Sequence, residues 1–400
     1  MRTKVLRDMA INIAASAIPL LVLKLIVLPL VAIETTSGQY GLVVTVDSFL
    51  SFCPATIGNV INNVRLIRNR DYESEHQGDF NVITLMGEAV SLICTIAYFA
   101  SLNALAPLNG ILAVLASVLW LLQSYWLVAF RIKIDYVGVF INNVVMSAGY
   151  LVGLLAFHTS GYWAFVYLTG QVFADLHLMR VTSLWKEPMR RTKLFKPVLV
   201  DTVTLAGSSL LARASSYCDR LILYPLLGGA AVSVYYVSTL FAKVISMITT
   251  PVSNVVLSYL AVREKAESHR FRITMIVGAV ACCVAYFAIL LIAGPAMRLI
   301  YPKFADAALM YLPITSITAL VSVLYSLANP FVLRFCPMRW QMLFSAVTLI
   351  IYLAAALVLL SVYGMMGFCW GALIAETARL LLVVVAYSRV AKTEDSNERN

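Results

Sequence analysis

Three basic residues lie deep inside apolar stretches of this sequence: Lys24, Arg213 and Lys243. A charge at that depth is costly in hydrocarbon, so it indicates a place that lipid does not occupy. Arg220 lies seven residues after Arg213, which puts both side chains on one helix face, about 10.5 Å apart along the axis. Because Arg binds phosphate through two parallel hydrogen bonds, this spacing suits a diphosphate and its first attached sugar.

Acidic residues occur in the same stretches and are candidate counter-ions or coupling sites: Asp47, Glu88, Asp219 and Glu376. For Asp47 and Glu88, pairing with the cations and reversible protonation are equally good interpretations. Arg220 either faces a cavity or lies at the membrane interface, paired with lipid or with Asp219. Glu376 precedes Arg379 by three residues, a spacing that favours a local ion pair.

Hydroxyl-bearing residues recur at helical spacing beside these charges. Interhelical hydrogen bonds would explain many of them, but a charge on the same face favours the lining of a hydrated cavity. The candidates for this lining are Ser209, Ser216, Tyr236, Thr239, Ser322 and Tyr325. Asp175 and His177 point to different faces of their helix, so we predict no proton relay between them.

The composition decides which kind of fold must position these side chains. Of 400 residues, 61% are hydrophobic and 12% are charged, whereas soluble domains have about 25% charged residues. This excludes a soluble domain, a disordered chain and a disulfide scaffold. The apolar stretches predict an all-α membrane protein of about twelve transmembrane helices, each of roughly 20 residues. We expect the first span to be a retained helix and not a cleaved signal peptide.

The basic residues predict the orientation and the division of the chain. Most of the 30 Lys and Arg residues fall on one side of the predicted spans, and only Arg298 and Lys303 fall on the other. Basic loops stay cytoplasmic, so we expect both termini inside and the net charge of +10 to reflect topology, with no nucleic-acid partner. We predict a six-helix lobe over 1–181, a basic cytoplasmic connector over 182–197, a second six-helix lobe over 198–390 and a polar cytoplasmic tail over 391–400, with a central cavity between the lobes.

Several kinds of chemistry have no sequence support. The seven cysteines show neither metal-ligand spacing nor a nearby His set, so we expect neither a metal site nor a disulfide. A phosphate-binding loop, a dinucleotide motif and a nucleophile elbow are all missing. We therefore predict no cofactor and no enzymatic activity.

Three stretches resemble the O-antigen-type flippases of the multidrug/oligosaccharidyl-lipid/polysaccharide exporter superfamily. The first runs from Ser37-Gly38-Gln39-Tyr40-Gly41 to Asn62-Asn63-Val64-Arg65. The second joins Asp219-Arg220-Leu221-Ile222-Leu223 to a run that begins Leu227-Gly228-Gly229. The third is Tyr301-Pro302-Lys303-Phe304-Ala305-Asp306-Ala307. The resemblance covers essentially the whole chain.

This resemblance implies a flippase in a bacterial inner membrane. Its cargo would be an undecaprenyl-diphosphate-linked oligosaccharide, moved from the cytoplasmic to the periplasmic leaflet as two lobes alternately open inward and outward. Lys24, Arg213 and Lys243 are the positions that match the cavity cations of the family, the match being loose at Lys243. Membrane lipids, a glycan polymerase and a chain-length regulator would be partners.

Two other functions stay open from the sequence. A cation-coupled multidrug exporter of the same fold would use an acidic, aromatic cavity for cationic cargo, and the acids within the spans fit that reading. A membrane glycan polymerase or glycosyltransferase is the weaker alternative, because it needs a sizeable external loop for its acceptor and general base. The longest such connection here is 294–306.

Overall fold

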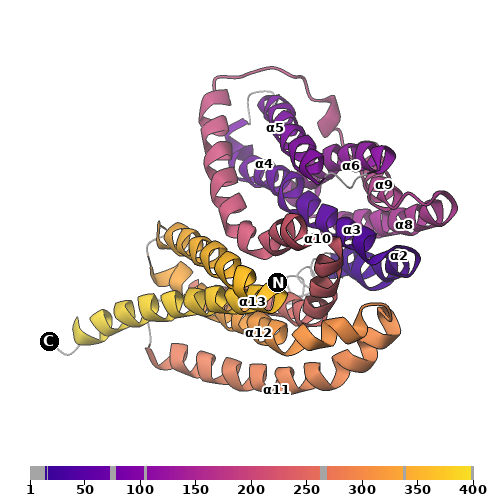
Figure 1. Cartoon of the computed structure of the whole chain (residues 1–400). Helices are drawn as coiled ribbons and strands as arrows, with labels where there is room; N and C mark the ends of the chain where they lie inside the picture. The colour runs from indigo at the N-terminus through magenta and orange to yellow at the C-terminus, as the bar shows by residue number, and fades with distance from the viewer. Residues whose placement is uncertain are drawn as a thin grey trace. The chain divides into compact units, whose positions relative to one another are not determined.

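The described residues of the protein form mainly long helices (Figure 1). A computed structural model describes residues 14–15, 17–72, 78–102, 106–261, 268–336 and 339–397, and these contain no strand. Within them, ten helices are long and apolar enough to span a membrane. The predicted all-α membrane fold is therefore confirmed. The number twelve and the cytoplasmic location of both termini stay predictions.

The chain divides into two compact units, and the first comprises residues up to Arg213 together with Tyr217–Gly229. Thr36 caps its third helix through a reciprocal pair of hydrogen bonds with Gln39: the Gln39 N–H donates to Thr36 Oγ1 and the Thr36 N–H donates to Gln39 Oε1, which satisfies two free backbone donors. The elements of this unit are η1 (Val22–Val27), α2 (Leu28–Glu34), α3 (Ser37–Phe52), α4 (Pro54–Arg68), η2 (Asn69–Tyr72), α5 (Asp79–Ser101), α6 (Pro107–Trp126), α7 (Val128–Ile132), α8 (Tyr136–Ser160), α9 (Ala164–Val181), η3 (Leu184–Lys186) and the first part of α10 (Phe195–Ala261).

Glycines let helices of the first unit approach closely. A Cβ atom added to Gly170 of α9 would lie 2.1 Å from the Tyr150 ring of α8, and one added to Gly41 of α3 would lie 1.8 Å from the Gly229 carbonyl oxygen. Small residues of this kind let helices pack tightly where no water is displaced. Tyr40-Gly41 and Gly228-Gly229, both in the stretches that resemble flippases, are thus neighbours in space.

The second unit comprises Ala214–Ser216 and Ala230–Asn400. It contains the rest of α10 with α11 (Ser268–Ile300), α12 (Ala305–Phe335) and α13 (Arg339–Asn397). Its core includes an aromatic cluster in which the Phe271 ring lies 5.2 Å from Phe331 and 4.5 Å from Tyr387, centroid to centroid. Such tilted and edge-on contacts stabilise apolar packing beyond simple burial.

Two long helices are broken at glycines. Gly228 interrupts α10 with φ 80° and ψ 173°, and Gly364 interrupts α13 with φ 60° and ψ −145°. Residues with a side chain rarely adopt these angles, so each glycine allows its helix to change direction. The segment 198–228 groups mainly with the first unit, whereas the predicted second lobe begins at residue 198. The division into two functional lobes stays a prediction.

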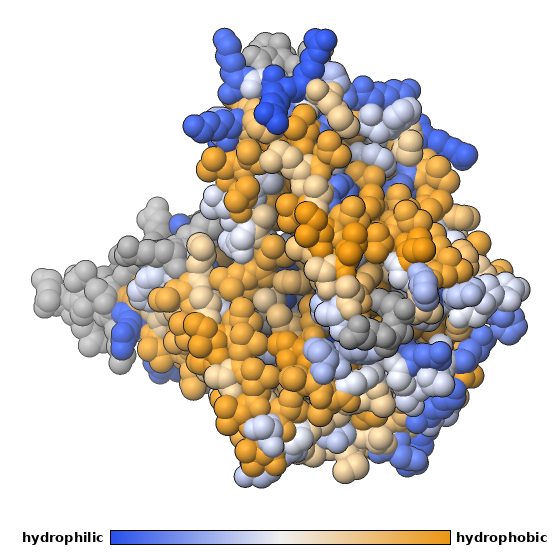
Figure 2. All heavy atoms as spheres, turned by 45° about the horizontal axis from the view of Figure 1, so that its top comes forward, coloured by the Kyte–Doolittle hydropathy of each residue, from blue (hydrophilic) through white to orange (hydrophobic). Residues whose placement is uncertain are grey.

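Large apolar side chains cover much of the surface. On α11, Phe287 is 70% exposed and Leu291 is 78% exposed. The face of the molecule drawn in Figure 2 has broad apolar areas. Soluble proteins rarely expose apolar patches of this size. The surface therefore fits contact with lipid.

Candidate functional site

Four charged residues and one serine from three elements interact inside the first unit, and we name this set the first charge cluster: Lys24, Asp47, Ser48, Asp219 and Arg220. Lys24 is half-buried, and its ammonium group interacts electrostatically with Asp47, Arg220 and Asp219. Asp47 is 2% exposed and Arg220 is also 2% exposed. Burial to this degree is rare for charged groups unless they are paired or hydrogen-bonded.

Local structure explains how these side chains are presented. Lys24 lies in η1, a π-helical turn that is followed by Pro29. Because Pro29 has no N–H, it cannot continue the regular helical hydrogen bonds, and π turns occur frequently at functional sites. On α10, Arg220 Nη1 donates to Ser48 Oγ at 2.9 Å, and the Arg220 N–H donates to Asp219 Oδ1 at 2.9 Å.

Arg213 lies beside this cluster. Arg213, Asp47, Arg220 and Asp219 all act electrostatically on Tyr217, whose ring lies 6.3 Å from that of Phe52. The structure thus brings the two arginines of the predicted helix face near the same tyrosine. With Lys24, they provide three cations against two aspartates.

A second set of charges lies inside the second unit, and we name it the second charge cluster: Lys243, Ser322, Tyr325, Glu376 and Arg379. Arg379 Nη1 lies 3.6 Å from Glu376 Oε1, and the Arg379 guanidinium lies 3.8 Å from the centroid of the Tyr325 ring. Ser322 and Lys243 both act on the Glu376 carboxyl group. The local pair expected between Glu376 and Arg379 is present. Ser322 and Tyr325 of α12 and Lys243 of α10 interact with this pair.

The remaining candidates are Thr239, Tyr236, Ser216, Ser209 and Glu88. Thr239 is buried, and its hydroxyl donates to the Tyr236 carbonyl oxygen of its own helix. Tyr236 is 1% exposed, in the interior of the second unit. Ser216 is exposed and Ser209 is half-buried; no hydrogen bond joins either to a cluster within the described ranges. Glu88 lies on α5, and it is not among the charges that act on Lys24.

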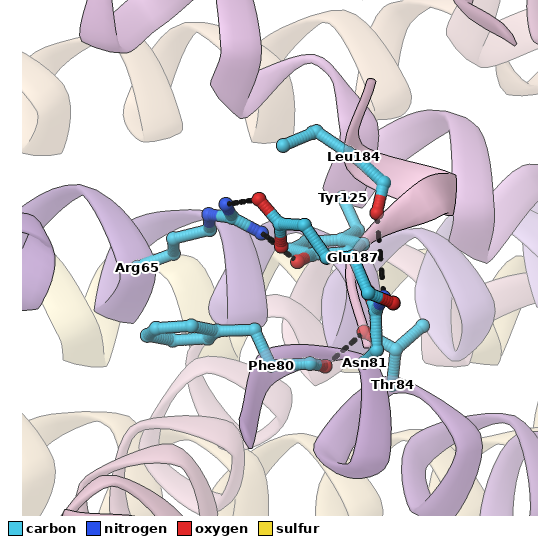
Figure 3. Close-up of polar contacts among 7 residues, drawn as sticks. All are labelled: Arg65, Phe80, Asn81, Thr84, Tyr125, Leu184 and Glu187. Carbon is cyan, nitrogen blue, oxygen red and sulfur yellow. Dashed lines mark hydrogen bonds and ion pairs between the residues drawn. The ribbon is translucent and has the colours of Figure 1, made fainter. Parts of the chain in front are cut away.

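A further ionic network joins the connector to α4, α5 and α6 within the first unit. We name its side chains the connector clamp: Arg65, Asn81, Tyr125 and Glu187 (Figure 3). Arg65 is 2% exposed and donates to both Glu187 oxygens, at 2.6 and 2.9 Å, and to the Tyr125 hydroxyl. Asn81 Nδ2 donates to the carbonyl oxygens of Leu184 and Glu187 at 3.3 and 2.9 Å. Part of the connector is thus held against α4, α5 and α6.

Neither the clamp nor Ser48 was predicted from the sequence. One signal was available: Glu187 is the one acidic residue in the basic connector over 182–197, and an acid in that setting suggests a specific partner. Ser48 carried no such signal, because it lies next to Asp47 on α3 and therefore about 100° away from it around the helix.

Comparison with known proteins gives the fold. No family model matches the chain, and no curated protein matches its sequence significantly. Solved structures do match. One is the lipid II flippase MurJ in an inward closed conformation, with a TM-score of 0.74 and 12% identity over 96% of this chain and 90% of that chain.

Transporters of the MATE family also match. The Vibrio cholerae MATE transporter VcmN in its bent form has a TM-score of 0.62 and 12% identity over 98% of this chain and 97% of that chain. An inward-facing multidrug resistance MATE transporter of the MOP superfamily has a TM-score of 0.61 and 14% identity over 96% of this chain and 99% of that chain. These neighbours are transporters or flippases, and the chain has the fold of MOP-type transporters.

Proposed function

We propose that this protein is a flippase that moves a lipid-linked oligosaccharide across a bilayer. The observation that carries this proposal is the first charge cluster, where Lys24 and the buried Arg220 act on each other inside the first unit, while Arg213 acts on the same tyrosine as Arg220. A diphosphate is costly to remove from water, and buried cations offset that cost. The neighbour MurJ is described as a lipid II flippase, which supports a cargo of this chemical class.

The cluster is arranged for exchange of one anion for another. Without cargo, Asp47 and Asp219 balance most of the positive charge of Lys24, Arg213 and Arg220. A diphosphate that enters would take over the arginine donors, because guanidinium groups bind phosphate oxygens bidentately. The aspartates would then be free to accept protons or to pair with another cation, so Asp47 and Asp219 are candidate coupling residues.

The full proposal follows the resemblance of the sequence to flippases. The cargo is an undecaprenyl-diphosphate-linked O-antigen-type repeat unit, moved from the cytoplasmic to the periplasmic leaflet of a bacterial inner membrane by alternating access. Ser322, Tyr325 and the other polar candidates bind sugar hydroxyls, Lys243 is a further cavity cation, and Glu376 is a coupling or counter-ion residue. A glycan polymerase and a chain-length regulator act on the product.

A reconstituted assay tests this function. The full chain is placed in proteoliposomes with a fluorescent undecaprenyl-diphosphate oligosaccharide, and flipping is measured as accessibility of the glycan to a glycosidase added outside. We expect Lys24→Ala and Arg220→Ala to lower the initial rate by about 100-fold, since a hydrogen bond to a charged group contributes about 1.5–3 kcal/mol. Normal rates in both variants would contradict the site.

Matched variants separate charge from folding. Arg220→Lys keeps the charge but loses the bidentate geometry, so we expect an intermediate rate. Lys303→Ala removes an exposed lysine from the loop before α12 and should leave the rate unchanged. Each variant is first checked for monodispersity and for its thermal unfolding midpoint in detergent, because removal of one partner from a buried ionic group destabilises proteins.

The second candidate function is a cation-coupled multidrug exporter. The acids Asp47 and Asp219 within the first charge cluster favour it, and the matching structures include MATE transporters. Accumulation of a cationic dye in inverted vesicles distinguishes the two functions. Dye transport that Asp47→Asn abolishes, together with no glycan flipping, would support the exporter and overturn the flippase.

A further inference from the structure

The connector between α9 and α10 presents its basic side chains to the outside. Six Lys and Arg residues in it and directly before it are exposed: Arg180, Lys186, Arg190, Arg191, Lys193 and Lys196. Within the part of the chain that the structure describes, no ion pair involves any of them. Cations gathered on one surface repel one another, so this surface favours an anionic partner.

The acidic residues of the same segment face inward. Glu187 and Asp201 are the two acids within 182–201. Glu187 Oε1 lies 2.6 Å from Arg65 Nη2, and Asp201 Oδ2 lies 2.7 Å from Arg68 Nη2, both on α4. Because both acids pair with arginines of another helix, they do not neutralise the outer cations of the connector.

The backbone of the connector is fixed in place. Asp79, the first residue of α5, accepts hydrogen bonds from the Thr192 N–H at 2.6 Å and from the Thr192 hydroxyl at 2.5 Å. Gly78 lies so close that an added Cβ atom would be 2.1 Å from the Pro188 carbonyl oxygen. A fixed backbone lowers the conformational entropy that is lost when a partner binds.

Exposed apolar side chains lie among these cations. Trp185 is 45% exposed and Met189 is 67% exposed, and Lys186 Nζ lies 5.2 Å from the centroid of the Trp185 ring. The Trp185 indole N–H already donates to the Met179 carbonyl oxygen at 3.1 Å, so the exposed part of the ring offers apolar surface. Tryptophan is enriched where hydrocarbon meets lipid headgroups.

The connector also leads directly into a stretch that can cross a membrane. This stretch is Phe195–Ala214, and in its first turns Val200 is 56% exposed and Val203 is 62% exposed. The Arg191 guanidinium lies 4.6 Å from the centroid of the Phe195 ring, where the helix begins. Since a span leaves the hydrocarbon at its end, we expect cations beside that end to lie at headgroup depth.

We propose that the outer face of the connector binds the phosphate groups of anionic phospholipids in the adjacent leaflet. Lys186, Arg190 and Arg191 bind the phosphates, and Trp185 and Met189 lie against the apolar part of the same lipids. The lipid phosphates supply the negative charge that the inward-facing acids do not. This inference goes beyond the proposed function, because it concerns lipids of the bilayer and not the cargo.

Quenching of tryptophan fluorescence by brominated lipids tests this surface. The full chain is reconstituted in phosphatidylcholine vesicles that contain the same small fraction of either brominated phosphatidylglycerol or brominated phosphatidylcholine. The contribution of Trp185 is the difference between the wild type and Trp185→Phe. We expect the phosphatidylglycerol to quench this contribution about fivefold more efficiently, since one basic residue beside an anionic surface contributes attraction of about that factor.

Matched variants separate charge from other effects. Lys186→Gln/Arg190→Gln/Arg191→Gln should abolish the preference for the anionic lipid, whereas Lys186→Arg/Arg190→Lys/Arg191→Lys should keep it. Arg298→Gln/Lys303→Gln removes two exposed cations on the other predicted side of the membrane and should also keep it.

Three outcomes would overturn the proposal: equal quenching of Trp185 by the two brominated lipids, an unchanged preference in the triple Gln variant, or quenching of Trp185 by neither lipid. The last result would place this face in water and assign it to a soluble anionic partner. Since the readout uses no lipid-linked oligosaccharide, its failure is distinguishable from failure of the flipping assay.

Discussion

Both units contain aromatic contacts, and they differ in how their buried charges are arranged. In the first unit, buried charges join distant parts of the chain, as in the connector clamp and in the bond between Arg220 and Ser48. In the described part of the second unit, Phe271, Phe331 and Tyr387 form an aromatic cluster in the core. Buried ion pairs contribute geometry more than net stability, whereas aromatic packing contributes stability directly.

The two charge clusters repeat this contrast on a smaller scale. The first draws its charges from η1, α3 and α10, and Arg220 and Asp47 are almost fully buried. In the second, Arg379 and Glu376 come from one helix, and Arg379 lies over the Tyr325 ring. The first cluster therefore depends on the tertiary structure, while the centre of the second is local.

The largest loss of stability should follow from damage to the aromatic cluster. Phe331 is 3% exposed and contacts both Phe271 and Tyr387. Phe331→Ala leaves a cavity, for which we expect about 3–5 kcal/mol lower free energy of unfolding. Chemical denaturation in mixed micelles measures it. A loss below about 1 kcal/mol would remove the contrast between the units.

A smaller loss should follow when one partner of the connector clamp is removed. Glu187→Gln leaves Arg65 buried without its counter-charge, and we expect a loss of about 2 kcal/mol, discounted because the Glu187 side chain is 24% exposed. The double variant Arg65→Met/Glu187→Leu should recover most of it, because no buried charge is left unpaired. If the double variant is as unstable as the single one, the clamp stabilises the fold outright.

The second charge cluster offers a test of function. Arg379→Gln removes a cation that lies over Tyr325 and beside Glu376. We expect flipping to slow by about tenfold, which corresponds to about 1.4 kcal/mol, and therefore less than in Arg220→Ala. Arg379→Lys should restore part of the rate. An effect larger than that of Arg220→Ala would make the second cluster the principal site.

The smallest effects should distinguish hydroxyls that link helices from hydroxyls that do not. Ser48 accepts a hydrogen bond from Arg220 on another helix, so we expect Ser48→Ala to lower stability by about 1–2 kcal/mol. Thr239 bonds to its own helix, and Thr239→Ala should change stability by less than about 0.5 kcal/mol. Equal midpoints of thermal unfolding for the two variants would contradict this distinction.

The sequence was sufficient for the fold because composition and span length act over many residues. Local helix geometry limited how many site residues could be placed from the sequence. The helix face shared by Arg213 and Arg220 could be predicted from spacing alone, and both residues act on Tyr217. The position of Lys24 could not, because a π-helical turn rotates the following side chains away from their regular helical positions.

Hydroxyl-bearing residues at helical spacing predicted which side chains lie together only where a charged residue needed a partner. Glu376, Ser322 and Tyr325 lie together because Arg379 and Lys243 act at the same place. Ser209 and Ser216 follow the same spacing without such a requirement. A serine hydroxyl on a helix can bond to its own backbone, so spacing alone cannot show which side chains lie together.

The packing of Gly41 against Gly229 has a consequence for biogenesis. All residues of the first charge cluster and of the connector clamp come before Gly229 in the sequence. During synthesis, their ionic partners are therefore all available before α11 leaves the ribosome. The nascent first unit can neutralise its own buried charges while the membrane still receives the remainder of the chain, which shortens the time that those charges spend without partners.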